Sequence, residues 1–134
     1  MITTHPLERF KDNLAQDIVA LGPVPRPTRL FISPWQAMSL LQKAIRRGQL
    51  DLALGAAANL LDTTPDRFWR RAGIIAFEDI GVADLPTVGI VTASLAGKRD
   101  RQALGGEWQV ASAIVARMVA AHKNRAADDR YCVL

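Results

Sequence analysis

The stretch Ser33-Pro34-Trp35-Gln36 carries a complete set of signals for the start of a helix. Ser33 is suited to cap the first turn, and Pro34 has the fixed φ angle that a first helical residue needs. Gln36 stands where its side chain can accept a hydrogen bond from the backbone of the cap. We expect a helix over about 34–47 that turns its apolar positions inward and is ended by Gly48. Those positions are Met38, Leu41 and Ile45.

The next segment, about 50–61, is apolar on nearly every side. A helix without a polar face is usually buried among other helices or at an oligomer interface. Thr64-Pro65-Asp66 then repeats the start signal, with Thr64 as the cap and Pro65 as the first helical residue. This second signal predicts a helix that fades near residues 78–79, where Gly81 can adopt the positive φ that turns the chain.

Asp84 is the expected cap of a further helix that runs to about Leu95. The β-branched run from Val88 to Thr92 leaves a buried strand as the alternative. A strand would have no second strand with which to pair, so the helix is favoured.

The flanking segments complete an all-α prediction of about five or six helices. Residues 7–21 predict an amphipathic helix, residues 22–27 an extended connector with three prolines, and residues 96–106 a polar loop. Residues 107–123 predict a long amphipathic helix, with His122 at the end of its apolar side. We therefore expect an N-terminal helical arm with a proline-rich connector (1–32), a helical domain (33–124) and a polar tail (125–134).

Composition limits the class of protein. The chain has 134 residues, 49% of them hydrophobic, which suits a single domain with a real core. One cysteine, Cys132, excludes an intramolecular disulfide and a zinc site of CxxC type. The sequence has no apolar run that could span a membrane and no apolar leader, so we expect a cytoplasmic protein. It contains no phosphate-binding glycine loop, HExxH or nucleophile elbow, and we expect no cofactor, no metal and no small-molecule substrate.

Basic residues gather in clusters although the net charge is only +4. Two triads have the i, i+3, i+4 spacing of one helix face: Lys43, Arg46 and Arg47, and Arg67, Arg70 and Arg71. A third cluster falls in the expected loop: Lys98, Arg99 and Arg101. Such clusters can bind backbone phosphates, or they can be solvated or paired with Asp51, Asp62, Asp66 or Asp79. No aromatic residue interleaves with them along the sequence, so a stacking platform for single strands is not expected.

Glu78 and Asp79 are adjacent carboxylates, which acid–base chemistry could use. Neighbours in a helix point about 100° apart, so a structural role at a helix corner is the better interpretation. A small hydrolase that uses both carboxylates is the alternative from the enzyme class. The three tryptophans lie in the first turns of expected helices: Trp35, Trp69 and Trp108. We expect them to anchor the core, and a place at an interface is the alternative.

The run from Phe68 to Asp84, FWRRAGIIAFEDIGVAD, resembles the "ARR…IASEDIGxAD" helix and corner of the RarA/MgsA family. Members of that family are AAA+ ATPases related to clamp loaders and associated with stalled replication forks. The upstream residues 42–54 are similar to the "KSIRGSD…DAAL" helix pair of the same C-terminal region. The similarity covers about residues 33–95. Phe77 stands where the family often has serine, and neither the N-terminal arm nor residues after 107 follow the family pattern.

The resemblance implies a helical fold like the region that follows the ATPase modules, which mediates oligomerisation in the family. The family's ATPase motifs are absent, so ATP hydrolysis is not implied. We therefore expect a non-enzymatic protein–protein interaction or oligomerisation domain in DNA replication or repair, with a protein partner or a second copy. Its helix corner would be fixed by Glu78, Asp79, Gly81 and Asp84. The alternative is a sequence-nonspecific DNA-binding protein that uses the two triads.

Overall fold

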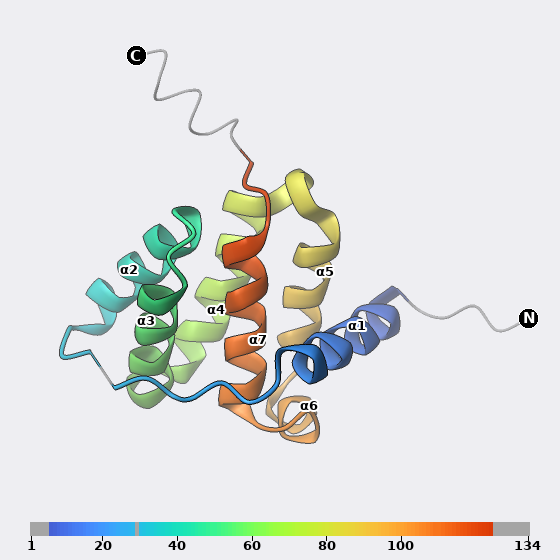
Figure 1. Cartoon of the computed structure of the whole chain (residues 1–134), viewed down its shortest axis with the longest axis horizontal. Helices are drawn as coiled ribbons and strands as arrows, with labels where there is room; N and C mark the ends of the chain where they lie inside the picture. Colours follow the sequence, from blue (N-terminus) through green and yellow to red (C-terminus); the bar gives the residue numbers. More distant parts are fainter. Residues whose placement is uncertain (1–5, 29, 125–134) are drawn as a thin grey trace, which may run out of the picture.

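The structure is a computed structural model that describes residues 6–28 and 30–124. The expected tail 125–134, with Cys132, and the histidine at position 5 lie outside the described residues. Every regular element in the described ranges is helical, which confirms the all-α class (Figure 1). The elements are α1 (Pro6–Leu21), α2 (Pro34–Arg46), α3 (Leu50–Thr63), α4 (Pro65–Ile75), the π-helical turn η1 (Ala76–Ile80), the 3₁₀ turn η2 (Gly81–Asp84), α5 (Leu85–Ser94), α6 (Lys98–Ala103) and α7 (Glu107–Ala120). Among them, no helix is long and apolar enough to cross a membrane.

Helix α3 packs against both α2 and α7 in the core of the domain. Ala53, Ala56 and Ala57 are fully buried, and their small side chains let the neighbouring helices approach closely. Asn59, also buried, donates from its amide to the carbonyls of Leu30 (2.6 Å) and Ile32 (3.2 Å). Most of this helix, which is apolar on nearly every side, is therefore buried within the chain, and Leu50 and Leu52 near its start are exposed.

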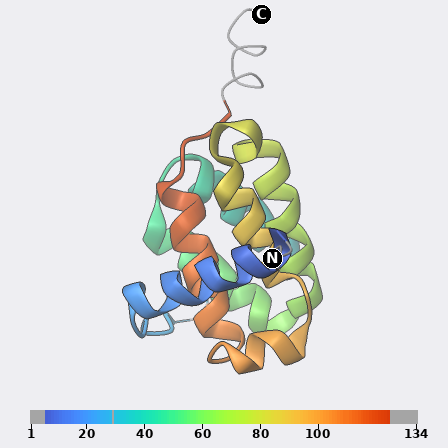
Figure 2. The same ribbon diagram turned by 90° about the vertical axis from the view of Figure 1, so that its right-hand side faces the viewer.

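Helix α1 lies across α5 and α7, as the turned view shows (Figure 2). Leu14 is fully buried, and Phe10 occupies the space above Gly89, where an added Cβ would lie 2.3 Å from the ring. Arg117 of α7 donates to Asp17 of α1 at 2.8 Å. The N-terminal helix therefore contributes to the common core.

The proline-rich connector after α1 runs along the end of the helices and is held by α7. Trp108 donates from Nε1 to the Val24 carbonyl at 2.8 Å, and Gln109 donates to the Gly22 carbonyl at 3.0 Å. Arg26 pairs with Asp62 of α3. Backbone groups that proline prevents from forming a helix thus find side-chain partners.

The two proline-marked helix starts behave differently. Ser33 forms the full capping box with Gln36, with the reciprocal bonds at 3.2 and 3.0 Å, which confirms the prediction. Thr64 does stand at the N-cap of α4, but its hydroxyl makes no capping bond and is buried without a partner among the described residues. The expected hydroxyl cap is therefore wrong for α4.

The structure corrects two further expectations and decides between the two alternatives for a third segment. Residues 96–106 are not all loop, because Lys98–Ala103 forms α6. Helix α7 ends at Ala120, so His122 lies beyond it and is exposed instead of on an apolar side. The segment Val88–Thr92 is helical, and Val88 and Val91 are buried in the core, where tertiary packing outweighs β-branched propensity.

Candidate functional site: an arginine groove between α2 and α4

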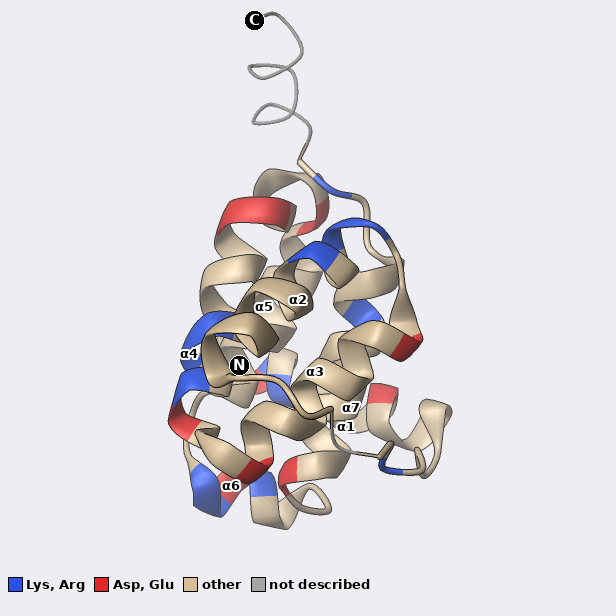
Figure 3. Cartoon of the chain, turned by 90° about the vertical axis from the view of Figure 1, so that its left-hand side faces the viewer, with Lys and Arg blue, Asp and Glu red and all other residues tan. Residues whose placement is uncertain are grey.

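Helices α2 and α4 lie side by side and enclose a surface groove of about 250 Å³. The groove, called here the arginine groove, is lined by Trp35, Met38, Arg67, Arg70, Arg71 and Ile74. Lysine and arginine segments mark both helices on this face (Figure 3). The structure therefore joins the second basic triad to an aromatic residue from another helix.

Trp35 is 69% exposed, so the expectation that it anchors the core is wrong. The reason is geometric: position 35 lies about 120° round the helix from the centre of the buried face that includes Leu41 and Ile45. The guanidinium carbon of Arg67 lies 5.3 Å from the Trp35 ring centroid, a cation–π contact. Basic and aromatic residues that are separate along the sequence thus interleave in space, which also corrects the sequence-based expectation.

The first triad is divided between two roles. Lys43 and Arg47 are exposed near the end of α2. Arg46 instead donates to Asp79 of η1 at 3.0 Å. Gln42 donates to the other Asp79 oxygen at 3.1 Å and accepts from Arg71 at 3.5 Å. Asp79 therefore links the arginine groove to the corner after α4.

The corner itself is held by three of the four residues expected there. Asp79 is buried, and its backbone carbonyl accepts from the Asn124 amide at 2.7 Å. Gly81 has φ +48°, as the turn requires. Asp84 caps α5 by accepting from Thr87 N (3.2 Å) and Thr87 Oγ1 (2.8 Å). The fourth residue, Glu78, is exposed.

Lys123 also lies near this corner. Its ammonium donates to the carbonyls of Val119 (2.9 Å) and Ala121 (2.6 Å). Burial lowers the pKa of Lys123, and the charge of Asp79 raises it part of the way back. The amine therefore caps the carbonyls at the end of α7, near the carboxylate of Asp79 that also pairs with Arg46.

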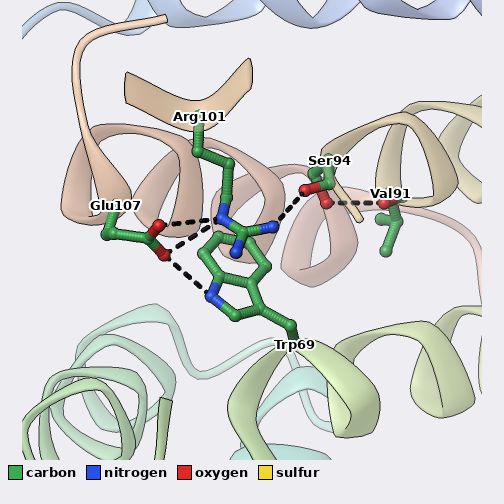
Figure 4. A network of polar contacts seen from close by, with 5 residues as sticks. All are labelled: Trp69, Val91, Ser94, Arg101 and Glu107. Carbon is green, nitrogen blue, oxygen red and sulfur yellow. Dashed lines mark hydrogen bonds and ion pairs between the residues drawn. The ribbon is translucent and has the colours of Figure 1, made fainter. Parts of the chain in front are cut away.

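The third basic cluster is divided between one buried residue and two exposed ones. Arg101 is buried, donates from Nε to both Glu107 carboxylate oxygens at 3.0 Å and from Nη1 to the Ser94 carbonyl at 3.0 Å, and stacks over Trp69 (Figure 4). Trp69 donates from Nε1 to the same Glu107 at 2.8 Å. Arg101 therefore ties α6 to α4 and α7, whereas Lys98 and Arg99 stay exposed.

The network in Figure 4 also forms one wall of a larger cleft of about 420 Å³. Arg26, Asp62, Asp66 and Lys98 lie on its other walls. Because basic and acidic groups alternate there and Arg26 is already paired with Asp62, the cleft has no dominant charge for a ligand to complement. The described residues also hold no cluster of three histidine, cysteine or acidic side chains that could bind a metal ion.

No protein-family model matches this chain, and no curated protein matches it as a relative. Fold and geometry define a class: an all-α helical domain with an arginine groove beside an exposed tryptophan. The groove was missed in the sequence because Trp35 and Arg67 meet only through the packing of α2 on α4. The one signal for it is the spacing of Trp35, Met38 and Gln42, which places all three on the side of α2 that faces α4.

Proposed function

We propose that this chain is a non-enzymatic protein–protein interaction domain that self-associates through the corner after α4. The observation that carries the proposal is a set of large apolar side chains exposed within nine residues: Phe77 (69%), Val82 (79%) and Leu85 (60%). The three residues belong to the successive elements η1, η2 and α5, and apolar side chains exposed together are typical of interaction surfaces. The resemblance to the RarA/MgsA family favours oligomerisation through this region and a role in DNA replication or repair.

The backbone beneath these side chains is well fixed. Asp84 binds Thr87, whose hydroxyl also accepts from Arg117 Nε at 3.1 Å. Asp79 is held by Gln42 and Arg46 on the other side of the corner. A surface ordered before binding loses less conformational entropy on association, which favours a binding role.

The non-enzymatic part of the proposal rests on the two carboxylates that could have served acid–base chemistry. Asp79 is buried and accepts from Gln42 and Arg46, whereas Glu78 is exposed, and neighbouring residues of a helical turn point in different directions. They do not converge on one reacting atom, as a shared acid–base site requires. If the chain were a hydrolase that used Glu78, substitution of this residue by glutamine would abolish its activity. For an interaction domain, we expect the same variant to fold and to associate like the wild type.

Light scattering across a concentration series tests self-association. We expect the wild-type chain to form a discrete oligomer and the double variant Phe77→Ser, Val82→Ser to shift toward the monomer. Val19→Ser is the matched control, because Val19 is equally exposed but lies on α1. A wild-type chain that stays monomeric at every concentration would overturn the proposal, as would equal dissociation by the control.

A further inference from the structure

The arginine groove combines an exposed aromatic face with unpaired positive charge. Arg67 and Arg70 are exposed, and neither forms an ion pair with any residue of 6–28 or 30–124. The nearby Asp66 lines the separate cleft beside Trp69 and is not a wall of this groove. The positive charge of the groove is therefore available to an external anion.

Trp35 supplies the second element of recognition. Its ring is exposed although Arg67 lies over it, and Phe31, four residues earlier, is 96% exposed. A folded chain gains nothing by leaving the indole of Trp35 in water, whereas a flat ligand can stack on the part of the ring that Arg67 does not cover. Arg71 also lines the groove, and its guanidinium donates from Nη1 to Gln42 Oε1 at 3.5 Å, so Gln42 holds it in place beside the groove.

An exposed aromatic ring beside unpaired arginines favours one class of polyanionic ligand over others. The carboxylate side chains of an acidic peptide could pair with the arginines, but they bring no ring of their own to stack on Trp35. A nucleic-acid duplex offers phosphates but keeps its base faces stacked inside. A single strand offers both phosphates and free base faces, and proteins bind it by this pairing of cationic groove and aromatic platform.

We propose that the arginine groove binds single-stranded nucleic acid, with a base stacked on Trp35 and phosphates on Arg67 and Arg70. The strand continues along α2 toward Lys43, which is exposed about 12 Å further along the helix axis. Stacking is insensitive to base identity, so binding is independent of sequence. This activity is separate from self-association at the corner, because the two surfaces share no side chain.

Titration of the full chain with oligothymidylate at low salt tests the proposal, with fluorescence anisotropy for affinity and tryptophan fluorescence for stacking. We expect the wild type to bind the single strand more tightly than a duplex of equal length, with quenching of its emission. Trp35→Ala should weaken binding about tenfold and remove most of the quenching. Since the ring is exposed, the variant should keep the wild-type circular dichroism and melting temperature.

Variants that remove positive charge from different places distinguish binding at the groove from attraction to the net charge of the protein. Arg67→Ala with Arg70→Ala should weaken binding and reduce the slope of log affinity against log salt by about 0.7 for each phosphate that is no longer neutralised. Lys98→Ala with Arg99→Ala removes the same charge from exposed positions on α6 and should leave affinity within about twofold. The proposal is overturned if the oligonucleotide does not bind at low salt, if Trp35→Ala binds like the wild type, or if polyglutamate binds as tightly as the oligonucleotide.

Discussion

Arg101 lies over the ring of Trp69, with its guanidinium carbon 4.1 Å from the ring centroid, and both residues donate to Glu107. This arrangement joins α4, α6 and α7 at one end of the domain, where α6 is too short, at six residues, to bury a large apolar face of its own. Arg101, which the sequence places in a cluster that could bind phosphates, thus holds three helices of the fold together.

The carboxylate of Glu107 is the group on which this tie depends. Glu107→Ala leaves Arg101 buried without its ion pair and Trp69 Nε1 without an acceptor, so we expect a loss of about 3 kcal/mol in the free energy of unfolding. Glu107→Gln keeps one acceptor and should lose less. Arg99→Ala, on the exposed side of α6, should change stability by no more than about 0.5 kcal/mol. Urea denaturation measures all three, and equal stabilities for the alanine variants would contradict the assignment.

Substitution of Gly89 tests whether α1 packs against the core. A Cβ added there would lie 2.3 Å from Phe10, too close for any real contact, so Gly89→Ala should destabilise the protein by about 1–3 kcal/mol. Phe10→Leu in the same chain should restore part of the loss. Gly73→Ala is the control, since its Cβ would meet only the flexible end of Leu95 at 3.0 Å and the helix gains propensity. A neutral Gly89→Ala would indicate that α1 is not docked.

Much of the fold could be predicted because its signals are local. The capping box at Ser33, the cap at Asp84 and the turn at Gly81 each depend on residues within one turn of each other, and the structure confirms all three. Helix α6 could not be predicted in this way, because its short polar sequence has no apolar period and it is held by the distant partners of Arg101.

The candidate site could be predicted only in part. Helical spacing identifies the face that carries Arg67, Arg70 and Arg71. It cannot show that Trp35 faces them, because that depends on how α2 packs on α4. Nor does it show that Arg46 is neutralised by Asp79, since the carboxylate reaches α2 only through the π-helical turn η1.

The two N-cap positions Asp84 and Thr64 make a matched pair. Asp84→Ala removes a cap that binds Thr87 and should cost about 1 kcal/mol. Thr64→Val should be neutral or stabilising, because it removes a buried hydroxyl that makes no hydrogen bond among the described residues. Thermal unfolding of both variants checks the contrast, which fails if Thr64→Val is the more damaging change.

Lys123 should make the stability of the fold depend on pH, with a sign that follows from its lowered pKa. Burial places its folded-state pKa below the usual 10.5, so between the two values the folded chain binds fewer protons than the unfolded chain. The contribution of Lys123 to stability should therefore rise as the pH increases from neutral toward 10.5, seen as a growing advantage of the wild type over Lys123→Gln. Asp79→Asn removes the charge that partly offsets burial, and NMR titration of the lysine ε-protons should show a still lower pKa. A pKa that rises in Asp79→Asn would contradict the coupling between these two residues.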